Sequence, residues 1–196
     1  MADKNGDSQW FISGRWQEYE GESRANLLRV AGIASFYSIE LFNRPQVTPA
    51  FHSAVTALAA GWVMVAWTVY ICLKRRVFPA SMKFLSTGAD LALFTCLLML
   101  ADGPRSPLIV GYFCILALAA LRFSVPLVRF ATAGAMASYI IVFRQALWMR
   151  PSLAVSRNYE MIVLVALLLC GTTFGQILRR VRAFAEDYAR RLATQP

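Results

Sequence analysis

Six long apolar stretches, each bounded by charged residues or proline, constrain this chain more than any other feature of its sequence. They run roughly over residues 25–42, 51–73, 84–101, 107–121, 125–148 and 159–181. A helix needs about 20 residues to cross about 30 Å of hydrocarbon, and most of the stretches are near that length. We therefore expect an all-α polytopic membrane protein, a six-helix transmembrane bundle that has the lipid bilayer as its solvent.

The composition agrees with a membrane protein. Hydrophobic residues make up 58% of the 196 residues, charged residues only 16%, and the mean hydropathy is +0.49. Soluble domains carry about 25% charged residues. The net charge of +9 could suggest nucleic acid, but the basic residues lie beside the ends of the apolar stretches, where they set membrane topology. We expect no nucleic-acid partner.

The basic residues also predict an orientation. Six spans place both termini on one side, and 15 of the 20 lysines and arginines then lie on that side. The other five are Arg44, Arg105, Arg144, Arg150 and Arg157. Because loops rich in lysine and arginine stay in the cytoplasm, we expect both termini to be cytoplasmic, in the inner (cytoplasmic) membrane of a cell.

The expected organisation has three parts. Residues 1–24 form an N-terminal arm, 25–181 the bundle and 182–196 a cytoplasmic helical tail. Ile12, Trp16 and Tyr19 recur at helical spacing, which favours a short interfacial helix with its rings at headgroup level over a plain solvated arm. Arg29 and Glu40 lie near opposite ends of the first stretch, where they are expected to snorkel towards water.

Asp90 is the candidate for intramembrane chemistry, because it falls near the middle of the third stretch. A carboxylate at that depth costs a few kcal/mol and must face other helices, be protonated or be paired. By depth, the candidate partners are Arg129, Thr172, Thr173 and Gln176. Two interpretations remain open: a proton, cation or ligand site, and a hydrogen-bonded residue that holds helices together.

Small residues predict close helix packing. Gly171 and Gly175 form a GxxxG motif in the sixth stretch, and Gly134 and Ser138 repeat the spacing in the fifth. Such spacing lets helix backbones approach closely. The motif serves either packing within one bundle or homodimerisation through the sixth span.

The sixth stretch is expected to continue into the cytoplasm as one helix, because residues 176–192 contain no proline or glycine. Ile177, Val181, Phe184 and Tyr188 are spaced four, three and four residues apart, which is typical of a coiled-coil seam. An amphipathic helix on anionic lipid is the alternative interpretation. We call these four residues the output seam.

Few residues point to other chemistry. Glu40, Arg144 and Glu160 are expected at the outer rim of the bundle, where they either bind a polar ligand or snorkel towards water. The sequence has no Walker A, HExxH or GxSxG motif, and its four cysteines all lie in apolar stretches with no CxxC spacing. We expect no catalytic residues, no metal site and no cofactor, and a protein that is not an enzyme.

A chain of six spans with short loops and a charged helix leaving the membrane at residues 176–191 resembles the membrane domains of bacterial signalling proteins. Membrane-bound class III adenylate cyclases and six-span sensor kinases have this arrangement, and the segments 101–107 and 121–123 are similar to such domains. The resemblance implies architecture alone and transfers no site residue. The sequence contains no cyclase or kinase domain, so the chain is expected to be either an excised domain or a stand-alone protein.

Three functions fit the sequence. The first is a non-enzymatic sensor or transducer module whose last helix passes a signal to a cytoplasmic partner, as a homodimer or with a partner membrane protein. The second is a small accessory subunit that stabilises a larger membrane complex. The third is a small channel or carrier centred on Asp90.

Overall fold

The computed structural model describes residues 3–43, 48–75, 79 and 81–193. These residues form six α-helices joined by short links. The helices are α1 (Asp3–Asn43), α2 (Pro49–Lys74), α3 (Met82–Leu100), α4 (Val110–Leu121), α5 (Val125–Met149) and α6 (Arg157–Ala193). Three single 3-10 turns, η2 (Gly103–Arg105), η3 (Pro107–Ile109) and η4 (Pro151–Leu153), lie in the links after α3 and α5.

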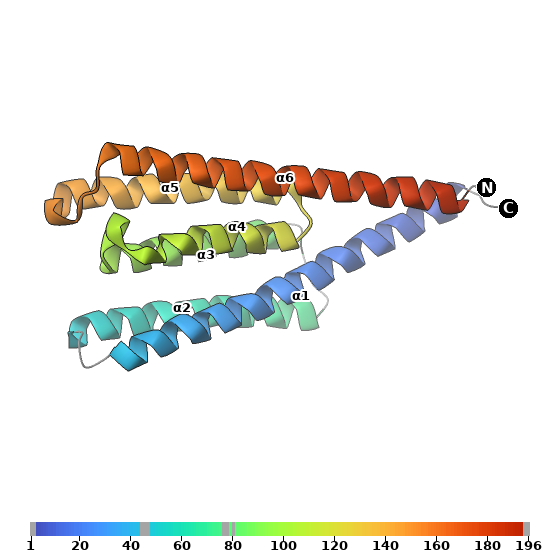
Figure 1. The fold of residues 1–196 in the computed structure, drawn as a ribbon. Coiled ribbons are helices and arrows are strands. Elements are labelled where there is room, and N and C mark those ends of the chain that lie inside the picture. Colours follow the sequence, from blue (N-terminus) through green and yellow to red (C-terminus); the bar gives the residue numbers. More distant parts are fainter. Residues whose placement is uncertain (1–2, 44–47, 76–78, 80, 194–196) are drawn as a thin grey trace.

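The helices run up and down in three layers of two (Figure 1). α3 and α4 form the middle layer, with α1 and α2 on one side and α5 and α6 on the other. The start of α1 and the end of α6 lie at the same end of the bundle, together with the end of α2, the start of α3 and the α4–α5 link. We call this the inner end, and the opposite end, which carries η2 and η4, the outer end.

Four of the described helices are long and apolar enough to cross a membrane: Pro49–Lys74, Met82–Leu100, Val125–Met149 and Arg157–Tyr188. The apolar segment Pro107–Leu121, which combines η3 and α4, is shorter. α1 has the length, but its charged residues lower its hydropathy. The structure thus confirms an all-α chain with the character of a membrane protein.

Local chemistry explains the helix boundaries. Thr48 caps α2 by accepting a hydrogen bond from the backbone N–H of Phe51 at 3.3 Å, and Pro49 occupies the first turn, where its missing N–H costs nothing. A second proline opens α5. Gly103 turns the chain after α3 with a φ of +55°, which glycine adopts without steric cost.

The composition of the N-terminal arm predicted a separate interfacial helix, and this prediction is wrong. α1 is continuous from Asp3 to Asn43, so the arm and the first apolar stretch share one axis. The physical reason is that the segment contains glycines but no proline, and a glycine alone costs only about 1 kcal/mol in a helix. The side chains of residues 3–18, including Ile12 and Trp16, lie outside the described part of the chain.

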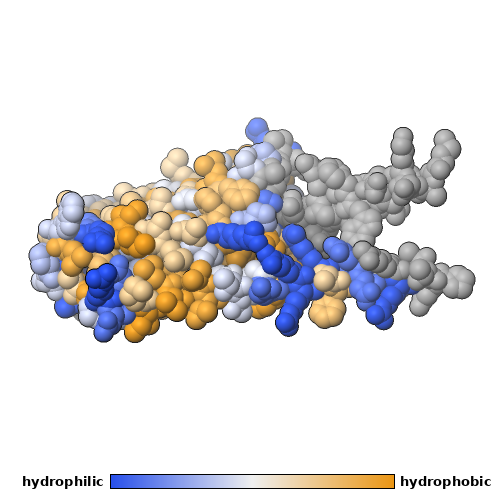
Figure 2. All heavy atoms as spheres, turned by 90° about the horizontal axis from the view of Figure 1, so that it is seen from above, coloured by the Kyte–Doolittle hydropathy of each residue, from blue (hydrophilic) through white to orange (hydrophobic). Residues whose placement is uncertain are grey.

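The core lies between α3, α4, α5 and α6. Tyr112 and Tyr139 are its largest fully buried side chains, and the rings of Phe94 and Tyr112 meet edge to face with centroids 5.0 Å apart. Around this core, large apolar side chains point outward over the middle of the bundle, and hydrophilic residues gather towards its ends (Figure 2). An apolar girdle between polar ends is what a bilayer requires. The four cysteines are free thiols, and none is fully buried.

Candidate functional site

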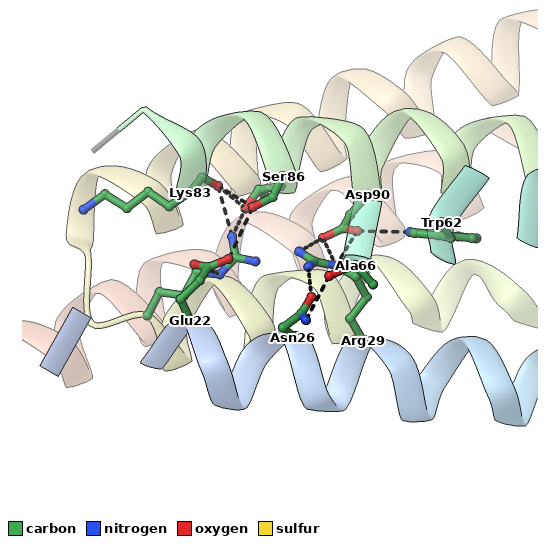
Figure 3. A network of polar contacts seen from close by, with 10 residues as sticks. Glu22, Asn26, Arg29, Trp62, Ala66, Lys83, Ser86 and Asp90 are labelled. Carbon is green, nitrogen blue, oxygen red and sulfur yellow. Dashed lines mark hydrogen bonds and ion pairs between the residues drawn. The ribbon is translucent and has the colours of Figure 1, made fainter. Parts of the chain in front are cut away.

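A ladder of polar side chains runs through the interior of the inner half of the bundle. On α1, Glu22, Asn26 and Arg29 follow one another at intervals of four and three residues, which places them on one helix face. That face is turned inward, and all three side chains are buried. Figure 3 shows them pointing towards Ser86 and Asp90 of α3. We call these residues and their partners the polar ladder.

Arg29 and Asp90 form its central contact. The guanidinium donates from Nε to Oδ1 at 2.9 Å and from Nη2 to Oδ2 at 2.8 Å, a two-pronged arrangement that matches the planar fork of arginine to a carboxylate. The indole Nε1 of Trp62, on α2, donates to the same Oδ1 at 3.0 Å. Arg29 is 4% exposed and Asp90 is 3% exposed, so the pair is fully enclosed.

Asn26 extends the ladder to α2. Its Oδ1 accepts a hydrogen bond from Nη1 of Arg29 at 2.7 Å, and its Nδ2 donates to the backbone carbonyl of Ala66 at 3.1 Å. All three nitrogens of the guanidinium are thereby engaged with buried acceptors. A polar residue buried in this way stabilises the fold only because its hydrogen bonds are satisfied.

Glu22 and Arg122 form a second buried pair, one to two turns nearer the inner end. Nε of Arg122 lies 2.9 Å from Oε2 of Glu22, as an ion pair without the alignment of a directed hydrogen bond. Nη1 of Arg122 donates to the carbonyl of Lys83 at 3.0 Å and to the hydroxyl of Thr87. The pair therefore joins α1 to the α4–α5 link and to the first two turns of α3.

Gly21 allows this approach. A Cβ at Gly21 would lie 2.8 Å from the carbonyl oxygen of Leu121 and 3.2 Å from Cα of Arg122, both of them backbone atoms. No side chain larger than hydrogen fits there without a shift of the backbone. The glycine thus sets the distance at which Glu22 meets Arg122.

Burial acts on both members of the inner pair. It raises the pKa of Glu22, while the charge of Arg122 opposes the shift. It lowers the pKa of Arg122, and here the carboxylate of Glu22 opposes. Desolvation is the larger effect on each group, so burial disfavours both charged forms, and the contact between Glu22 and Arg122 offsets only part of that cost.

The structure confirms that Asp90 faces other helices, but the partners expected from depth are wrong. Arg129, Thr172, Thr173 and Gln176 are all exposed on α5 and α6 and do not contact it. Arg129, Thr172 and Gln176 instead line a groove between α5 and α6.

The partner that sequence reasoning missed is Arg29, which was expected to snorkel and is instead buried. Snorkelling fails because Asp90 lies within reach and supplies an enclosed counter-charge. The signal was the spacing of Glu22, Asn26 and Arg29, which puts three strongly polar residues on one face of α1.

The two glycines of the GxxxG motif do different things. A Cβ at Gly171 would collide with the side chain of Thr132, whose own Cβ lies only 2.8 Å away, so α6 packs closely on α5 at this point. A Cβ at Gly175 would meet nothing within 4 Å. Gly134 packs against Leu91, and Ser138 is half-buried. Gly171 and Gly134 therefore serve close packing within the bundle.

The expected outer-rim residues lie at the outer end but are not assembled into one site. Glu40 lies 3.5 Å from Nδ1 of His52. Arg144 is exposed on α5, and Glu160 is half-buried in the first turn of α6. Within the described part of the chain, no contact joins these three side chains.

α6 continues through Gln176 without a break and ends at Ala193, which confirms the expected single helix. The output seam is exposed along its whole length, with exposed fractions between 45% for Val181 and 73% for Phe184. Arg182 donates to the backbone carbonyl of Phe123 in the α4–α5 link, so the base of the extension is tied to the bundle.

The chain was compared with known protein families, curated proteins and solved structures. No protein-family model, no curated protein and no solved structure matches the chain.

Proposed function

We propose that this chain is a non-enzymatic membrane sensor or transducer module whose last helix is its output. The observation that carries the proposal is the 37-residue helix α6, Arg157–Ala193, which packs in the bundle at one end and projects beyond it at the other. A rigid helix shared by two regions is a direct mechanical link between them.

The projecting part of α6 favours a partner helix. Every described side chain from Arg179 to Tyr188 is exposed, and the seam contributes three large apolar side chains to this segment, Val181, Phe184 and Tyr188. Exposed apolar side chains at coiled-coil spacing gain stability when an equivalent seam covers them. The partner is a second copy of this chain or another membrane protein.

The proposal includes six crossings of the membrane with a cytoplasmic inner end. α1 supports it because its large apolar side chains, among them Leu27, Phe36 and Phe42, are exposed, whereas Arg29 points inward. A charge that faces a partner inside the bundle does not prevent a helix from facing lipid with its other side. The excess of basic residues at the inner end favours the cytoplasmic assignment, in an inner membrane.

The two other functions are less favoured by the geometry. An accessory subunit would use the same seam to bind an unrelated chain. A carrier centred on Asp90 requires a carboxylate that can exchange partners, yet Asp90 is enclosed and already accepts hydrogen bonds from Arg29 and Trp62.

Crosslinking in native membranes tests the output helix. In a chain freed of its native cysteines, Val181→Cys and Phe184→Cys are expected to give disulfide-linked dimers. Glu186→Cys, on the opposite helix face, is the matched control and is expected to give none. Crosslinks to an unrelated protein alone would favour the accessory subunit, and equal crosslinking of all three variants would contradict a defined seam.

Labelling tests the orientation. A membrane-impermeant thiol reagent is expected to modify Asp102→Cys, in the α3–α4 link, in intact cells. Glu186→Cys should be modified only after the membrane is opened. Labelling of Glu186→Cys from outside would refute the orientation and with it the cytoplasmic output.

A further inference from the structure

A groove lies between α5 and α6 near the inner end of the bundle. Its volume is about 340 Å³. It is lined by Val125, Arg129, Thr132, Ala133, Met136, Leu168, Gly171, Thr172, Gly175, Gln176 and Arg179. Arg129 belongs to the second turn of α5, and Arg179 lies where α6 leaves the bundle. The groove therefore lies at the level where a spanning bundle would meet lipid headgroups.

The two glycines shape the groove. At Gly171 the helices touch through Thr132, and one turn later, at Gly175, a side-chain Cβ would have no neighbour within 4 Å, so the helices leave a space. Met136 and Leu168 supply apolar walls on the side away from the inner end. The hollow is thus polar at one end and apolar at the other.

The charge at the polar end is unbalanced. Arg129 and Arg179 are both exposed, and neither makes an ion pair or a side-chain hydrogen bond with any described residue. None of the lining residues is acidic. A second hollow of about 400 Å³ adjoins the first, shares Thr172 and Gln176 with it, and adds a third guanidinium, that of Arg180.

We propose that this groove binds an anionic phospholipid of the inner leaflet. Arg129 and Arg179 hold the phosphate, Thr172 and Gln176 offer hydrogen bonds to the rest of the headgroup, and an acyl chain lies along Met136 and Leu168. Basic pockets between helices on the cytoplasmic side are typical sites for anionic headgroups. The apolar walls favour a lipid over a free phosphate, which would leave them exposed to water. The inference depends on the membrane crossing proposed above but not on the output helix.

Native mass spectrometry of the detergent-solubilised chain tests the site. The probes are phosphatidylglycerol and phosphatidylcholine with identical acyl chains, together with glycerol phosphate, which has no acyl chain. We expect tight binding of one phosphatidylglycerol, weaker binding of phosphatidylcholine and no retention of glycerol phosphate. Equal binding of the two lipids would overturn the proposal, and retention of glycerol phosphate would assign the site to a soluble anion.

Paired variants locate the binding. Each arginine near an anionic surface contributes about fivefold in affinity, so Arg129→Gln with Arg179→Gln is expected to raise the dissociation constant of phosphatidylglycerol about 30-fold. Arg144→Gln with Arg157→Gln removes two exposed arginines from the outer ends of the same helices and is the matched control, expected to change it less than twofold. An equal loss in both pairs would show a response to net charge and refute a defined site.

Filling the groove separates its shape from its charge. Gly175→Leu keeps both arginines, and because a Cβ at this position would meet no atom within 4 Å, the added side chain has room to enter the groove; circular dichroism checks that the variant folds. We expect it to displace the lipid as effectively as the double arginine variant. Unchanged lipid binding in a folded Gly175→Leu protein would overturn the groove as the site. If lipid binds as expected while the seam variants fail to crosslink, the output proposal fails and this one stands.

Discussion

Removal of the Arg29 guanidinium is the sharpest test of the polar ladder. Arg29→Met keeps most of the side-chain volume but deletes the donors to Asp90 and Asn26. Among the described residues, the carboxylate, 3% exposed, is then left with the indole N–H of Trp62 as its hydrogen-bond donor. Breaking one side of a buried charge pair costs about 3–5 kcal/mol. That is a large share of the roughly 5–15 kcal/mol that typically separates folded from unfolded protein.

A second substitution distinguishes charge from volume. Asp90→Asn alone leaves Arg29 buried without its counter-charge and is expected to cost a similar amount, about 3–5 kcal/mol. Combined with Arg29→Met it removes the stranded charge, while the amide oxygen can still accept from Trp62. The double variant should therefore lose only about 1–2 kcal/mol, the scale of one or two neutral hydrogen bonds.

The matched control lies on the same helix. Arg24 and Glu20 form an ion pair at 2.5 Å whose side chains are 71% and 51% exposed. Exposed pairs contribute about 0–1 kcal/mol, so Arg24→Met should barely change stability. The measurement is equilibrium unfolding by SDS in mixed micelles, followed by circular dichroism. Loss in Arg29→Met no larger than in Arg24→Met, or a double variant as unstable as the sum of the singles, would refute the reasoning.

Three further predictions concern packing and pH. Gly171→Ala should destabilise the protein by about 1–3 kcal/mol by overpacking against α5, whereas Gly175→Ala should leave the melting temperature unchanged. Gly21→Ala should also destabilise, because its Cβ meets backbone rather than a movable side chain. Burial raises the pKa of Glu22, so the folded state keeps a proton that the unfolded state loses between the ordinary value near 4.5 and the raised one. Stability should fall as pH rises through that window, and the melting temperature of Glu22→Gln should lack this component; a pH profile identical to that of the parent would contradict it.

Several features could be predicted from sequence because they depend on local chemistry. The lengths of the apolar stretches, with proline and charge at their ends, predicted α2, α3 and α5 to within a few residues. The absence of breakers after Gly175 predicted that α6 runs on through Leu192. The cost of a carboxylate at mid-depth predicted that Asp90 faces inward, as it does.

The partner of Asp90 was decided by tertiary structure. The apolar stretches indicate only how deep a residue lies along its own helix. By depth alone, Arg129 and Arg29 are both possible partners for a carboxylate on the third helix. Which of them it meets depends on which helices are neighbours. α1 lies against the middle layer on the face that carries Arg29, whereas Arg129 points out of α5.

The same limit applies to the glycines and to α1. The GxxxG spacing predicts that the two glycines share a helix face. Only the tertiary structure shows that Gly171 packs against Thr132 of α5, whereas Gly175 lies beside a groove. Charge lowers the mean hydropathy of α1 without stating where the charges point. Sequence determines properties along one helix, because those come from its own side chains and backbone. Pairings between helices are set by three-dimensional packing, in which residues such as Arg29 and Asp90, 61 positions apart, satisfy each other.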